Sequence, residues 1–115
     1  MSNRYDKIED YIFSVFNVFQ LVNKKAEQQQ DKRMKMVALV IFNYVRFMAK
    51  EFNIHLTSVH EKENINLMPI FEYVAANDIQ LYDFKTININ DIDMSSKKDI
   101  ERFVLTHIYY ITQGK

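Results

Sequence analysis

The sequence predicts a mainly helical domain built from four helices. Apolar residues recur at intervals of three and four positions in four separate segments, which is the period of an amphipathic helix. The 115 residues include one glycine and one proline, so a β architecture with many tight turns lacks its usual turn residues. Turns that need a positive φ must therefore use asparagine or aspartate. The length fits a single domain, which we expect to span residues 1–115.

The first two predicted helices cover residues 5 to about 25 and residues 33–52. Residues 23–31 between them are polar, yet they consist mainly of good helix formers. Residues 5–53 therefore form either a helical hairpin or one helix of about 45 residues. We favour the hairpin, because so long a helix would leave much of its apolar face unpaired in a small domain. The apolar stripe of the second helix contains Val37, Val40, Ile41, Tyr44, Phe47 and Met48.

The second half of the chain predicts a short helix, an extended segment and a final helix. The short helix covers residues 67–76 and has Pro69 in its first turn, where the missing amide costs little. Ile87 and Ile89 alternate with polar residues, which favours a short extended or β segment around residues 79–92. Ser96 and Asp99 resemble a capping box that starts the last helix. The apolar stripe of that helix contains Ile100, Phe103, Val104, His107, Ile108 and Ile111.

The composition indicates a cytoplasmic protein that needs no cofactor. Fifteen basic and fifteen acidic side chains balance, so no strong overall field attracts the chain to nucleic acid or anionic lipid. There is no cysteine, residues 1–10 do not resemble a signal peptide, and no apolar run is long enough to cross a bilayer. The abundance of Phe, Tyr, Met, Ile, Asn and Lys is typical of an AT-rich genome. We therefore expect the cytoplasm of a low-GC bacterium, or of a host infected by its phage.

Several large apolar side chains fall outside the main stripes of the first two helices. Such groups need a second partner to cover them. Two explanations remain open: the chain itself covers them in a compact bundle, or they form a surface that binds a second copy or another protein. A homodimer is the default form of the second explanation. The candidate interaction residues are Phe13, Leu21, Leu39 and Phe42.

Two further clusters suggest only weak chemistry. His55, His60, Glu61 and Glu63 lie within nine residues, but they show neither the His-Glu-x-x-His spacing nor a Cys-assisted pattern, so no metal site is predicted. A basic cluster surrounds the predicted turn between the first two helices. Basic clusters without interleaved aromatic residues are usually solvated rather than bound to nucleic acid. The candidate nucleic-acid contacts are Lys24, Lys25, Lys32, Arg33 and Lys35.

One motif in the last helix carries a family resemblance. The segment Arg102-Phe-Val-Leu-Thr-His107-Ile-Tyr109 matches Arg-x4-His-x-Tyr, which resembles the signature of HEPN-family ribonucleases, helical-bundle dimers that cleave RNA without a metal. The resemblance implies that His107 acts as general acid/base, that Arg102 stabilises the phosphate and that Tyr109 supports the site, with both subunits contributing at the dimer interface. Phe103 departs from the family, which usually has a polar residue there. On a regular helix, five positions correspond to about 140°, so His107 and Arg102 point in different directions.

These observations lead to three functional hypotheses. The first is a small non-enzymatic interaction or regulatory module of phage or plasmid type, which forms a homodimer and acts by binding a partner protein. The second is a HEPN-like, metal-independent endoribonuclease. The third is an accessory protein that binds nucleic acid.

Overall fold

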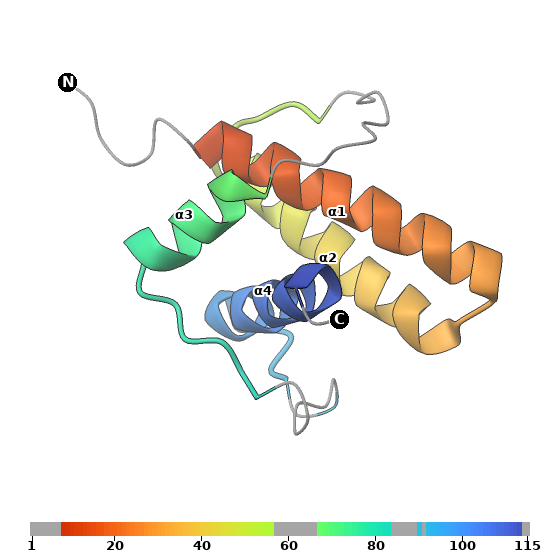
Figure 1. Ribbon diagram of the computed structural model, residues 1–115. Coiled ribbons are helices and arrows are strands. Elements are labelled where there is room, and N and C mark those ends of the chain that lie inside the picture. The colour runs from red at the N-terminus through yellow and green to blue at the C-terminus, as the bar shows by residue number, and fades with distance from the viewer. Residues whose placement is uncertain (1–7, 57–66, 84–89, 91, 114–115) are drawn as a thin grey trace.

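The computed structural model describes residues 8–56, 67–83, 90 and 92–113, and these residues form four helices and no strand (Figure 1). The helices are α1 (Ile8–Gln29), α2 (Lys32–Glu51), α3 (Met68–Ala76) and α4 (Lys97–Gln113). The predicted fold class is therefore confirmed. Residues 79–83 adopt no regular secondary structure, while Ile87 and Ile89, on which the expected extended segment depends, lie outside the described residues.

α1 and α2 form a helical hairpin, as predicted, and the alternative of one long helix is wrong. α1 continues to Gln29, because residues 24–29 are good helix formers. The turn then needs one residue at positive φ, which is Gln30 at 52° rather than the asparagine or aspartate expected. This conformation lets the amide of Asp31 donate to the carbonyl of Ala26, at 3.0 Å. Asp31 in turn caps α2 by accepting from the amide of Met34, at 3.1 Å.

The other helix ends follow the predicted capping chemistry. Asn53 and Asp78, which follow α2 and α3, have φ of 55° and 52°, as expected in a chain with almost no glycine. Pro69 lies in the first turn of α3. Ser96 precedes α4, and its hydroxyl accepts from the amide of Asp99 at 3.3 Å, so the predicted start of this helix is confirmed.

α4 occupies the centre of the bundle. The α1–α2 hairpin forms one side, α4 packs against α2, and α3 packs against α1 (Figure 1). α4 runs opposite to α2, since Lys97 at its start bonds Glu51 at the end of α2, at 2.9 Å. No helix in the described ranges is both long and apolar enough to cross a lipid bilayer.

The burial of α4 differs from the predicted single stripe. Six consecutive residues, from Phe103 to Ile108, are each at most 7% exposed. The predicted stripe left out two of them, Leu105 and Thr106. Leu105 faces Ile70 of α3 across a small apolar hollow, and the hydroxyl of Thr106 accepts from the amide of Tyr82 at 2.9 Å. α3 and the segment after it thus cover the side of α4 that the hairpin leaves open.

Candidate docking surface

The outer side of α2 carries an exposed apolar stripe of three large side chains. Met36, Leu39 and Phe47 are 51%, 52% and 54% exposed. At 100° per residue they lie within an arc of about 80°, and Asn43 is at its centre. We call these four residues the α2 stripe. Phe47 was predicted to belong to the core stripe of this helix, and its exposure corrects that prediction, since its angle places it at the edge of the buried arc.

Two hollows flank the α2 stripe and meet at Asn43. The first, of about 330 Å³, lies between α2 and the start of α4 and is lined by Met94 and Ile100 as well as by Met36 and Leu39. The second, of about 490 Å³, lies toward the segment after α2 and includes Phe47 and Ile54. The first half of the stripe therefore borders one hollow and its second half borders the other, and a neighbouring element adds apolar side chains to each.

Basic side chains frame the α2 stripe. α2 contains five basic residues and one acidic residue. Lys32 and Lys50 lie at its two ends on the same side as the stripe, and Arg46 lies beside it. The acidic residue, Glu51, is already engaged by Lys97. Within the part of the chain that the structure describes, Lys32, Arg46 and Lys50 have no ion-pair partner.

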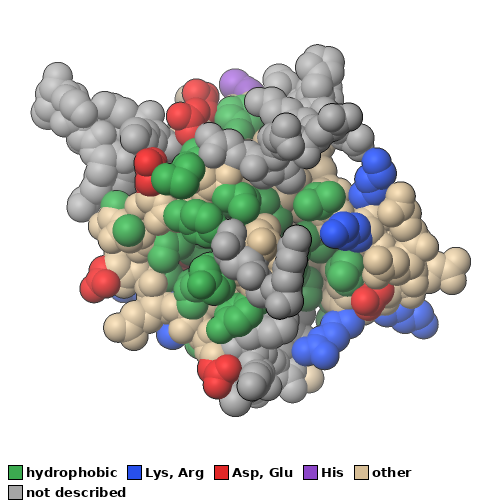
Figure 2. All heavy atoms as spheres, in the orientation of Figure 1, with side chains coloured by type: hydrophobic (Ala, Val, Ile, Leu, Met, Phe, Trp, Pro, Cys, Tyr) green, Lys and Arg blue, Asp and Glu red, His purple; other side chains and the backbone are tan. Residues whose placement is uncertain are grey.

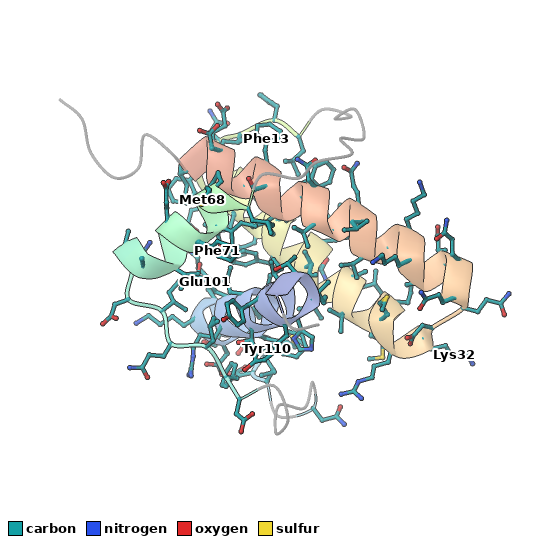
Figure 3. The ribbon with its side chains drawn as sticks, in the orientation of Figure 1. Phe13, Lys32, Met68, Phe71, Glu101 and Tyr110 are labelled. Carbon is teal, nitrogen blue, oxygen red and sulfur yellow. The ribbon has the colours of Figure 1, made fainter. Side chains whose placement is uncertain are left out.

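The four predicted interaction residues do not form one surface. Leu39 belongs to the α2 stripe. Phe42 is half-buried against Phe19 of α1, with ring centroids 4.9 Å apart, so the chain itself accounts for it. Leu21 is 36% exposed on α1, and Figure 3 shows Phe13 on the edge of α1 that faces away from α4. Sequence reasoning missed Met36, although its spacing of three and seven positions from Leu39 and Asn43 indicates a shared face.

A polar network joins all four helices, and no sequence motif indicated it. It is buried at Tyr11 and Tyr44 and partly buried at Tyr73 and Glu101. The hydroxyl of Tyr44 donates to Oε2 of Glu101 at 2.6 Å, and that of Tyr73 donates to the same oxygen at 2.9 Å. The hydroxyl oxygen of Tyr11 lies 2.7 Å from that of Tyr44. Tyr11 is the donor of this bond, since the hydroxyl hydrogen of Tyr44 already takes part in the hydrogen bond to Glu101. The rings of Tyr11 and Tyr73 stack with centroids 3.8 Å apart. In Figure 3, Glu101 lies where α3 and α4 approach each other.

The electrostatics of this network suit a structural role. Burial raises the pKa of Tyr11 and of Tyr44 well above the ordinary value for tyrosine, with the negative charge of Glu101 adding to the effect. Both phenols therefore remain protonated and act as hydrogen-bond donors at neutral pH. The network fixes the relative positions of the helices that support the α2 stripe.

The structure separates the two key residues of the Arg-x4-His-x-Tyr motif. Arg102 donates from Nε to the carbonyl of Gln80 at 2.7 Å, and its guanidinium lies 3.9 Å from the ring centroid of Tyr82. His107 is buried, and its Nδ1 lies 3.0 Å from the carbonyl of Phe103. Tyr109 is exposed beside Phe71. Within one chain, Arg102 and His107 thus do not converge on a common point.

The surroundings of His107 favour its neutral form. Burial lowers the pKa of this imidazole below its ordinary value, and the positive charge of Arg33 lowers it further. The hydrogen bond to Phe103 acts in the opposite direction but is outweighed. At pH 7 the ring therefore carries one proton, on Nδ1, which it donates to the carbonyl.

We expect the purified protein to leave single-stranded RNA intact in EDTA. Arg102 is held against Gln80 and Tyr82, and His107 is enclosed in the core, so the two side chains do not meet at one phosphate. Gel electrophoresis of labelled RNA measures this, and an added ribonuclease confirms that the substrate can be cleaved. Cleavage by the wild type that is lost in both Arg102→Ala and His107→Ala would instead support the ribonuclease resemblance.

The basic cluster lies at the hairpin end of the bundle. Figure 2 shows several Lys and Arg side chains toward this end, whereas hydrophobic side chains gather over α3 and α4. Lys24, Lys25, Lys32 and Arg33 are exposed, and Figure 3 shows Lys32 beside the turn. Lys35 is instead held by Asn23 and Glu27, at 2.6 and 3.1 Å.

The described residues hold no cluster of three or more histidine, cysteine or acidic side chains that suits a metal ion. His55 is exposed, and the other candidates, His60, Glu61 and Glu63, lie outside the described residues. No protein-family model, characterised protein or solved structure gives a significant match to the chain.

Proposed function

We propose that this protein is a non-enzymatic interaction module that binds another polypeptide through the α2 stripe. The supporting observation is that Met36, Leu39 and Phe47 are each more than half exposed on one side of one helix. Clustered apolar groups of this size normally mark a binding surface. Covering the exposed half of each side chain contributes about 1 kcal/mol, so the three together contribute about 3 kcal/mol. That corresponds to a roughly hundredfold gain in affinity.

A homodimer is one assembly that such a face permits, because a two-fold axis near Asn43 would place each stripe against its copy. The same stripe also suits a different protein, and in either case it acts as a docking face and not as a catalytic site. We further propose, from the composition, that the binding takes place in the cytoplasm of a low-GC bacterium or of a phage-infected cell. Binding of nucleic acid by the cluster around Lys32 remains the weaker proposal.

Peptide display tests whether the α2 stripe is a docking face. We expect peptides selected on the immobilised wild type to lose at least tenfold in affinity for Leu39→Glu, because a buried carboxylate would oppose docking. Leu21→Glu is the matched control: it places the same change on α1, away from the stripe, and should bind as the wild type does. Peptides that bind all three proteins equally would show that the docking face lies elsewhere.

A further inference from the structure

We propose that the occupant of the α2 stripe is an amphipathic helix of another protein, with acidic residues on both sides of its apolar face. This inference rests on the proposed function and specifies the partner. Three features of the surface carry it: the spacing of the stripe, the two hollows beside it and the unbalanced charge of its frame.

The shape of the surface fits a helix. Met36 and Phe47 are eleven positions apart, which on a helix is about 16 Å, or three turns. Apolar side chains spaced three and four positions apart on a partner helix would enter the two hollows, which meet at Asn43. The amide of Asn43 would remain at the centre of the contact, where a single polar residue sets the register of a helix pair.

The positive charge around the α2 stripe favours a partner helix with acidic residues beside its apolar face. Lys32 and Lys50 lie at the two ends of the stripe and Arg46 at its side, and none of them has an ion-pair partner among the described residues. A partner with Asp or Glu beside its apolar face would meet a cation at both ends and along one edge. Such complementarity raises the association rate and discriminates against partners of the wrong charge.

The same charges oppose a second copy of this chain. In an antiparallel pair with its two-fold axis at Asn43, the edge that carries Arg46 meets the same edge of the copy. In a parallel pair, Lys32 faces Lys32 and Lys50 faces Lys50. Both arrangements bring cations together, and the two nearby carboxylates, Glu27 and Glu51, are already engaged. An anionic membrane would match the charge, but a flat lipid surface would leave both hollows unfilled.

Fluorescence anisotropy with designed peptides tests the partner class. The probe is an 18-residue helix with Leu at three positions of one face and Glu on both flanks, and its control carries Lys in place of Glu. We expect the Glu peptide to bind at least tenfold more tightly than the Lys peptide in low salt, with the difference shrinking as salt screens the charges. The double substitution Arg46→Glu, Lys50→Glu should reverse this preference. Leu39→Glu should abolish binding of both peptides, and Leu21→Glu should change neither.

Each alternative gives a different result. Equal binding of the Glu and Lys peptides, lost in Leu39→Glu, would overturn the acidic partner and leave the docking face in place. A wild-type dimer in sedimentation at tens of micromolar, broken by Leu39→Glu, would assign the stripe to a second copy. Binding to phosphatidylglycerol vesicles that depends on Leu39, without peptide binding, would assign it to a membrane. If neither Leu39→Glu nor Phe47→Glu weakens any binding or assembly, the proposed function itself is overturned.

Discussion

Replacing Leu105 with alanine is expected to lower the free energy of unfolding by about 3 kcal/mol, as measured by urea denaturation. The side chain is 1% exposed in the middle of α4. It already borders an apolar hollow of about 190 Å³ between α3 and α4. The substitution would enlarge this hollow, and Ile70 and Leu81 on its far side are held by their own elements. The side chains around position 105 therefore lose their contacts with the deleted methyl groups and cannot move in to replace them.

Leu39→Ala is the matched control for this prediction. It removes the same atoms from a side chain that is half in solvent, so we expect a loss of less than about 1 kcal/mol. Equal effects of the two substitutions would show that α4 is covered on one side only, as a single apolar stripe implies. A loss near 3 kcal/mol confined to Leu105→Ala would support its central place in the bundle.

Glu101→Ala is expected to lower the free energy of unfolding by about 2–3 kcal/mol. The carboxylate accepts hydrogen bonds from Tyr44 and Tyr73 in a partly buried site, and its loss removes the acceptor of both bonds. Glu101→Gln keeps an acceptor oxygen but loses the charge, so we expect a smaller loss. The midpoint of urea denaturation, monitored by circular dichroism, gives all three values.

Glu51→Ala provides the comparison for a carboxylate at the surface. Its ion pair with Lys97 is open to solvent, and such pairs contribute about 0–1 kcal/mol. If Glu101→Ala were no more damaging than Glu51→Ala, solvent would be satisfying the two phenols. The network would then contribute little to the positions of the helices.

The four helices could be predicted because their information is local. Periodicity placed each helix within a few residues, and capping residues such as Asp31 and Ser96 marked where α2 and α4 begin. The turn of the hairpin could also be predicted, since an unbroken helix would leave its apolar face unpaired. Only the residue used at positive φ, Gln30, departed from expectation, and the backbone bond from Asp31 to Ala26 offsets the cost of that conformation for glutamine.

The enclosure of α4 could not be predicted, because periodicity reports one apolar face and not the number of neighbours. Leu105 and Thr106 are buried by α3 and by the segment after it, whose position follows from tertiary packing. The network of Tyr11, Tyr44 and Glu101 joins residues up to 90 positions apart, so no spacing in the sequence indicates it.

The candidate site was predictable in part. Leu39 stood out because it lies far from the core side of its helix. Phe47 was assigned to the core because its angle is near the edge of the apolar arc, where the packing of a neighbouring element decides exposure. Met36 lies at a similar edge. The basic residues of α2 could be counted in the sequence. Whether Lys35 or Lys50 has an ion-pair partner, however, depends on which residues of other helices lie nearby.

The order of the helices along the chain also has a kinetic consequence. α1 and α2 are joined by two residues, so the entropy lost in closing the hairpin is small. The hydrogen bond between Tyr44 and Glu101 instead joins residues 57 positions apart. Docking of α4 therefore costs more chain entropy and is the slower event. We therefore expect the hairpin to form early and the central helix to enter last. Until it does, the inner faces of α1 and α2 stay open to solvent, and this partly folded form is the one most prone to aggregate.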